Sequence, residues 1–147
     1  VPVSVRQLRS PKRDMAIVAA AGPAVNLIMA LLWTVILLAT HNLMHSMPAV
    51  ALPLLLMSVA GIFVNLVLMA INLLPVPPLD GGRVVTGLLP MALARVYARI
   101  EPFGMIILIL LLISGVVGMV LAPVVFGAID LLPGSELVLG ILPTLFP

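Results

Sequence analysis

The chain has no cysteine and very little charge. Of its 147 residues, 8% are charged and 4% are aromatic, whereas 63% are hydrophobic. The lack of cysteine excludes disulfides and thiolate metal sites, so any metal must bind through oxygen or nitrogen ligands. An ordinary soluble domain carries about 25% charged residues. The composition therefore excludes a soluble globular domain and a disordered polar tail, and it predicts a protein whose solvent is the bilayer.

The excess of basic over acidic residues, seven against five, does not indicate nucleic-acid binding. The basic residues flank apolar runs and form no patch interleaved with aromatics, so we expect membrane lipid as a partner and no nucleic acid. The chain opens on Val1 without the pattern of a signal peptide. We expect residues 1–147 to be a single membrane-embedded domain and a fragment of a longer protein.

Long uncharged runs define the expected spans. No Asp, Glu, Lys or Arg stands between Asp14 and Asp80, which leaves room for two crossings of about 20 residues each. The polar segment THNLMHSMP divides this stretch and predicts spans over residues 15–39 and 49–73. A further apolar run predicts a third span over residues 103–126. The predicted fold is all-α: a multi-pass transmembrane helical protein with about three spans.

The second span ends in the segment NLLPVPPLDGGR, residues 72–83. Its prolines remove backbone donors and favour extended conformations, and its two glycines loosen the chain. This pattern predicts a broken helix. Beyond it, residues 83–100 are interrupted at Pro90 and suit a helix at a membrane interface. The final apolar run, residues 137–146, is too short to cross.

All basic residues fall on one side of the three predicted spans, and none lies in the segment around His41 or in the C-terminal tail. By the positive-inside rule this side is cytoplasmic. We therefore expect an integral protein of a bacterial cell membrane, with residues 1–14 and 74–102 on the cytoplasmic side. The basic residues are Arg6, Arg9, Lys12, Arg13, Arg83, Arg95 and Arg99.

Asp80 is the one acid between Asp14 and Glu101, and it stands where the second span breaks. Irregular backbone at membrane depth is tolerated where it is buried or lines a water-filled cavity, and an acid there commonly binds an ion, a proton or a partner charge. The alternative is that Asp80 caps a helix that begins at Gly81 or Gly82 at the membrane surface. The position alone favours neither.

Two sequence motifs favour a functional role of Asp80 over a capping role. The first reads NxxPxxxLDG and the second, upstream, reads GPxxN; together, and in this order, they resemble the site-2 protease family of intramembrane zinc metalloproteases. The residues of the first motif are Asn72, Pro75, Leu79, Asp80 and Gly81, and those of the second are Gly22, Pro23 and Asn26. The resemblance covers residues 1–89 best.

The resemblance implies that Asp80 is a Zn²⁺ ligand and that the residues from Asn72 to Leu79 form the wall of a substrate groove beside it. Unpaired backbone groups around Pro75 and Gly81 could then bond to an unwound substrate strand. The glycine and proline of GPxxN, read alone, allow a kink or a close helix contact, and Asn26 suits an interhelical hydrogen bond. Beside the other motif, we expect these residues to support the active-site region.

One feature of such enzymes is missing. A zinc protease of this type takes two histidine ligands and its general base from an HExxH helix, and the sequence contains no HExxH. The string HNLMH has the spacing, in His41 and His45, but Asn42 cannot act as a base and the string follows GPxxN instead of preceding it. We expect the HExxH helix to lie before Val1.

The sequence thus predicts part of an intramembrane metalloprotease that cleaves transmembrane-helix substrates and holds its third zinc ligand at Asp80, inactive without the HExxH segment. The alternative is a non-enzymatic membrane scaffold or transporter component, because transporters also use broken helices with a lone acid. The oligomeric state stays open.

Overall fold

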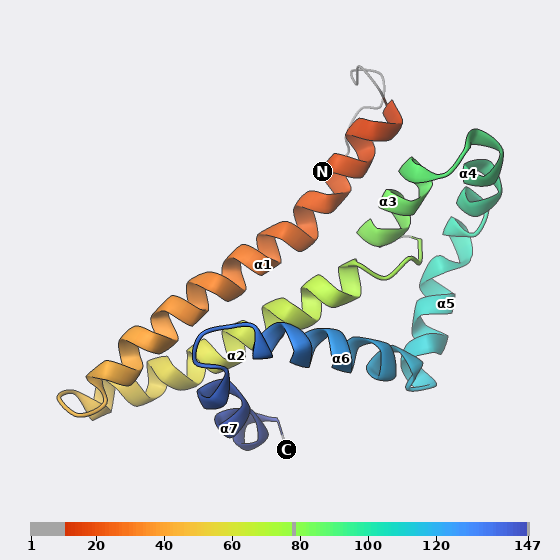
Figure 1. Cartoon of the computed structure of the whole chain (residues 1–147). Helices are drawn as coiled ribbons and strands as arrows, with labels where there is room; N and C mark the ends of the chain where they lie inside the picture. The colour runs from red at the N-terminus through yellow and green to blue at the C-terminus, as the bar shows by residue number, and fades with distance from the viewer. Residues whose placement is uncertain (1–10, 78, 147) are drawn as a thin grey trace. The chain divides into compact units, whose positions relative to one another are not determined.

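A computed structural model of the protein describes residues 11–77 and 79–146, and within these ranges it consists of seven helices and no strands (Figure 1). The all-α prediction is confirmed. Arg6 and Arg9, which contribute to the topology prediction, lie outside the described residues. The helices are α1 (Pro11–Leu43), α2 (Pro48–Asn72), α3 (Asp80–Leu88), α4 (Met91–Ala98), α5 (Glu101–Ile113), α6 (Val116–Asp130) and α7 (Ser135–Leu145).

Helices α1 and α2 are each long and apolar enough to cross a membrane. They have 33 and 25 residues, so they extend about 50 Å and about 37 Å at 1.5 Å per residue, against a hydrocarbon core of about 30 Å. The predicted spans over residues 15–39 and 49–73 fall almost entirely within them. The connection is shorter than predicted, because α1 continues to Leu43, whose carbonyl accepts the N–H of Met47 at 2.9 Å.

The run over residues 103–126, predicted as one span, is divided between two helices. Helix α5 ends at Ile113, and Gly115 adopts a left-handed conformation with φ of 77°. Its N–H donates to the carbonyl of Leu112 at 3.2 Å, which is the usual way in which glycine ends a helix. A third crossing within the described residues requires that α4 and α5, bent by 63° at their junction, form a single span.

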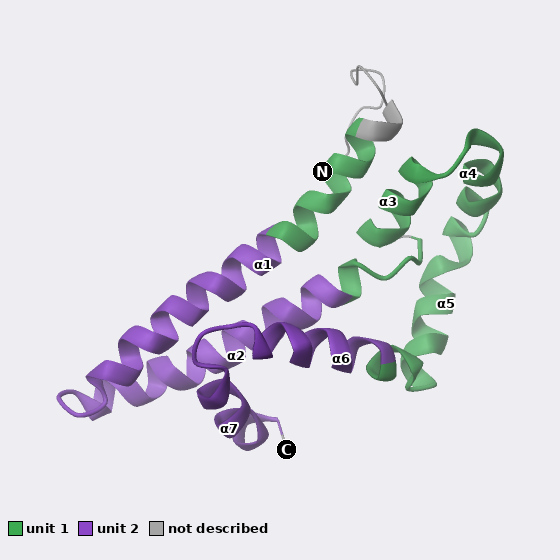
Figure 2. Ribbon diagram, viewed as in Figure 1, with its two compact units in different colours: residues 1–24, 71–119 green, residues 25–70, 120–147 purple. Residues whose placement is uncertain are grey.

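The chain divides into two compact units (Figure 2). Unit 1 contains residues 1–24 and 71–119, and unit 2 contains residues 25–70 and 120–147. The candidate site residues of the NxxPxxxLDG motif all belong to unit 1, together with Gly22 and Pro23. In unit 1, α3 and α4 pack against each other.

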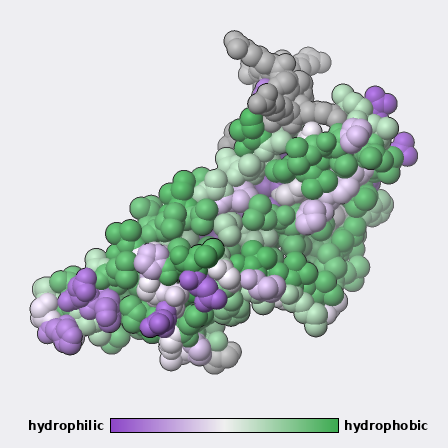
Figure 3. Space-filling model, in the orientation of Figure 1, coloured by the Kyte–Doolittle hydropathy of each residue, from purple (hydrophilic) through white to green (hydrophobic). Residues whose placement is uncertain are grey.

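In unit 2, α2 is apolar on both its buried and its exposed faces. Buried residues such as Leu55, Ile62 and Leu66 recur every three or four positions, while Met57 and Val64 are exposed. Hydrophobic residues also dominate the visible surface (Figure 3). A helix that is hydrophobic all round suits a membrane span.

Several polar side chains of α1 and α2 donate hydrogen bonds to carbonyls of their own helix. Thr34 donates to the carbonyl of Ala30 at 2.9 Å, Ser58 to that of Leu54 at 2.7 Å, and Asn65 to that of Gly61 at 2.7 Å. In lipid an unpaired polar group is costly, and these bonds remove that cost without a partner helix.

In unit 2, α1 and α2 are in contact where the indole of Trp33 packs on Gly61. A Cβ on Gly61 would lie 2.5–2.6 Å from Cγ, Cδ2 and Cε2 of Trp33. These ring atoms include the one nearest the backbone, so the indole cannot move aside cheaply. Small residues allow helices to approach in this way in membranes, where van der Waals packing drives association.

We therefore expect Gly61→Ala to lower the free energy of unfolding of the purified protein in detergent by about 1–3 kcal/mol, as overpacking does. The measurement is a denaturant titration followed by circular dichroism. Gly127→Ala is the matched control, because a Cβ there meets nothing within 4 Å. Equal stability of the two variants would contradict the proposed contact.

Candidate functional site

Asp80 is the first residue of α3 and does not cap it. The N-cap is Leu79, in an extended conformation with ψ of 159°, and it makes no side-chain capping bond. Asp80 is half-buried, and its carboxylate makes no hydrogen bond with any residue that the structure describes. The carboxylate oxygens are thus left to accept from, or to coordinate, another group.

The two residues after Asp80 fit closely against the segment before it, residues 73–77, which we call the wall. A Cβ on Gly81 would lie 2.5 Å from the carbonyl oxygens of both Leu73 and Leu74, and a Cβ on Gly82 would lie 2.6 Å from the nitrogen of Pro77. Both contacts are with backbone, which cannot swing away. The first turn of α3 and the wall therefore form a single close-packed element that only glycine allows.

The wall and the residues that follow it to 79 have more carbonyl acceptors than amide donors. Three of their N–H groups are bonded locally: Leu74 to the carbonyl of Ile71 at 3.0 Å, Val76 to that of Leu74 at 2.8 Å, and Leu79 to that of Val76 at 2.9 Å. The prolines at 75, 77 and 78 have no N–H. A substrate strand would thus meet mainly acceptors in this segment.

The two sequence motifs meet at Gly22 and Asp80. A Cβ on Gly22 would overlap Oδ2 of Asp80 and would lie 3.4 Å from its Cγ. The carboxylate therefore lies directly against the backbone of α1, in the space that a side chain at residue 22 would fill. Both residues belong to unit 1, so this contact is internal to one compact unit.

The remaining predicted site residues are distributed as follows. Pro23 is buried inside α1, where its missing N–H leaves the carbonyl of Ala19 without an intrahelical partner. Asn72 is the last residue of α2 and is half-buried in unit 1. Asn26, also half-buried, falls in unit 2. Neither asparagine side chain bonds to a described residue.

A complete metal site is not formed by the residues that the structure describes. No group of three or more His, Asp or Glu side chains gathers among them. His41 lies in the last turn of α1, whereas His45 lies in the turn that follows, so the pair does not share a helical face. Both are exposed. Asp80 is therefore one potential donor without further donors beside it in the described part of the chain.

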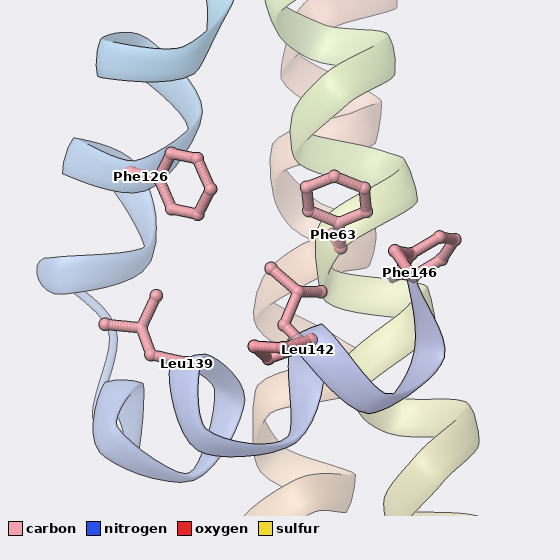
Figure 4. A pocket seen from close by; sticks show the side chains of 6 residues that line it. Phe63, Phe126, Leu139, Leu142 and Phe146 are labelled. Carbon is pink, nitrogen blue, oxygen red and sulfur yellow. The ribbon is translucent and has the colours of Figure 1, made fainter.

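A cavity of about 230 Å³ in unit 2 has no lining side chain that could act in catalysis or bind a metal. Phe63 and Phe146 stand with ring centroids 5.0 Å apart beside it, and Figure 4 shows the side chains around it. Its lining is apolar throughout and includes no titratable group, so it is a gap in the hydrophobic packing and not a candidate active site. It is lined by Phe63, Phe126, Leu139, Leu142, Pro143 and Phe146.

One residue of the site is absent from the sequence-based prediction. The hydroxyl of Tyr97, in α4, donates to the carbonyl of Pro75 at 2.6 Å. The sequence predicts only an interfacial helix in this region. A signal was present, since Tyr97 is the one tyrosine of the chain and follows the proline-rich segment, but tyrosine at a membrane interface has a simpler explanation.

Comparisons with known proteins identify relatives. The model of Peptidase family M50 matches residues 42–115. The chain is 33% identical over 124 residues to the Putative zinc metalloprotease YwhC of Bacillus subtilis (strain 168), a match that covers 84% of this chain and 57% of that relative. The chain thus spans somewhat more than half the length of the curated relative that it matches. No solved structure matches.

The contact between Gly22 and Asp80 predicts a coupled pair of substitutions. Gly22→Ala should destabilise the protein by less than Gly61→Ala does, because the new methyl group overlaps the end of the Asp80 side chain, which can rotate away. In the double variant with Asp80→Ala the overlap is gone, so we expect a coupling free energy above about 0.5 kcal/mol in a denaturant titration. Gly118→Ala, where a Cβ meets nothing within 4 Å, is the control. Strict additivity would show that the two residues do not touch.

Proposed function

The chain belongs to peptidase family M50, the site-2 protease family, and from this premise we propose that it supplies part of the catalytic core of an intramembrane zinc metalloprotease, with Asp80 as one zinc ligand. The observation that carries the proposal is the contact between Gly22 and Asp80. It joins the GPxxN and LDG motifs at one point and leaves a carboxylate against a helix backbone with its oxygens available.

The chemistry of Asp80 fits a zinc ligand. Zinc accepts carboxylate oxygens beside histidine nitrogens, typically in a four-coordinate site. The Asp80 carboxylate is half-buried and has no competing hydrogen bond among the described residues. The absence of a side chain at residue 22 leaves room for the carboxylate, and the close packing of Gly81 on the wall holds the backbone beside Asp80. A ligand whose backbone is already fixed loses less entropy when it binds a metal.

A zinc site at Asp80 needs further ligands. We propose that an HExxH helix supplies two histidines and the glutamate that acts as general base, because the sequence contains no HExxH and HNLMH does not replace it. The match covers 57% of the curated relative, which is consistent with a longer protein. Zinc, when bound, activates water for attack on a peptide carbonyl.

The wall is proposed to hold the substrate. A transmembrane helix must unwind before its peptide bonds can be cleaved, and its freed N–H groups then need acceptors. The carbonyls of Leu74, Pro75 and Val76 each accept one bond already, so their second lone pairs and the carbonyls of Leu73 and Pro77 are the acceptors proposed for the substrate. The N–H groups of Leu74, Val76 and Leu79 are used in local bonds. The substrate strand is therefore held mainly through its own N–H groups.

Metal analysis tests the role of Asp80. In the protein expressed from its complete reading frame and purified in detergent, we expect about one zinc per chain, lost in Asp80→Ala together with peptidase activity. Asp80→Asn should lower zinc affinity 10-fold or more, since the amide has no charge. Asp130→Ala removes an exposed acid of the same type and should change neither.

Two outcomes would contradict the proposal. Zinc that is retained in Asp80→Ala would remove Asp80 from the metal site. No zinc in any variant would favour the non-enzymatic alternative, a membrane scaffold or transporter component with Asp80 as a proton or partner site.

The same proposal places residues 1–14 and 74–102, and with them Asp80, toward the cytoplasm of a bacterial cell membrane, by the distribution of the basic residues. Because the printed sequence has no cysteine, single cysteines report topology directly. In intact cells, a membrane-impermeant maleimide should label Ser46→Cys and should label Ala98→Cys only after permeabilisation. Both positions are exposed. The reverse pattern would invert the topology.

A further inference from the structure

We propose that Tyr97 is a positioning residue for the wall, and through the wall for Asp80; this inference rests on the proposed function. The hydroxyl of Tyr97 donates to the carbonyl of Pro75 at 2.6 Å, across 22 positions of sequence. That distance is at the short end for an O–H···O hydrogen bond. The bond joins α4 to the segment that stands immediately before the candidate ligand.

The wall has few other hydrogen bonds to the rest of the molecule. Proline at 75 and 77 removes two backbone donors, and the N–H of Val76 bonds only to Leu74, two residues away, at 2.8 Å. Local bonds of this kind set the shape of a turn but do not attach it to the rest of the molecule. Among the hydrogen bonds within the described residues, the one from Tyr97 ties the wall to a separate helix.

A displacement of the wall cannot leave Asp80 in place. Gly81 stands against the carbonyls of Leu73 and Leu74, and Gly82 stands against Pro77, at distances that leave no space even for a methyl group. The first turn of α3 must therefore follow the wall. Since Asp80 begins that turn and lies against Gly22, the hydrogen bond from Tyr97 holds the wall, and with it Asp80, relative to α4.

The bond also sets the orientation in which the Pro75 carbonyl oxygen faces a substrate. The Tyr97 hydroxyl occupies one of the two lone pairs of the Pro75 carbonyl oxygen and fixes the direction of the other. Tyr97 thus orients the carbonyl without contact with the reacting atoms, which is why we assign it positioning and not catalysis. Aromatic anchoring at the interface, by contrast, needs the ring and not the hydroxyl on this carbonyl.

The test removes only the hydroxyl oxygen. In the full-length protein, Tyr97→Phe keeps the ring and should lower kcat/KM for a single-span membrane substrate on the order of 5-fold, as expected for loss of one neutral hydrogen bond. Most of the loss should appear in KM, because the wall binds substrate, and the zinc affinity should fall by no more than a similar factor, because Asp80 follows the wall. Val96→Ala, an exposed neighbour on α4, is the control.

A second measurement does not depend on activity. With Val76→Cys as the only cysteine, the rate of maleimide labelling should rise several-fold when Tyr97→Phe is added, and should not rise with Val96→Ala. An unchanged labelling rate would overturn the positioning role, even if Tyr97→Phe lowers activity. A raised rate in a protein without zinc or peptidase activity would support the role of Tyr97 in holding the wall and would count against the proposed function alone.

Discussion

The close approach of α1 to the Asp80 carboxylate is the constraint on which the arrangement of unit 1 depends. A carboxylate can lie against a helix backbone only where that helix has no side chain, and Gly22 provides this position. The requirement continues on the other side of Asp80, where Gly81 and Gly82 allow the wall to press on the first turn of α3. Three glycines thus confine one acid between two backbones.

A second constraint is that polar groups in a membrane must be hydrogen-bonded or removed. Within α1 and α2, the side chains of Thr34, Ser58 and Asn65 bond to carbonyls of their own helix, which satisfies them without a partner helix. Where the chain leaves helical structure after Asn72, prolines eliminate donors, and the N–H groups of Leu74, Val76 and Leu79 form short local bonds. Carbonyls therefore outnumber N–H groups in the wall, because proline supplies only a carbonyl.

Hydropathy was sufficient to predict the two long helices, and the motifs were sufficient to predict the family. Composition could not show the end of α5, because Gly115 is one small residue in a continuous apolar run and acts through its backbone conformation. The sequence also left open whether Asp80 caps a helix, and the structure places that role at Leu79. The bond from Tyr97 to Pro75 joins two segments whose proximity depends on how α3 and α4 pack, which no local pattern specifies.

The contact between Trp33 and Gly61 has a consequence for spectroscopy. Trp33 is the one tryptophan of the chain, and its indole rests on the backbone of α2 within unit 2. The emission of that indole therefore originates from a single known place, the junction of the two long helices. The chain carries an intrinsic fluorophore that monitors how its helical hairpin closes, separately from events at Asp80.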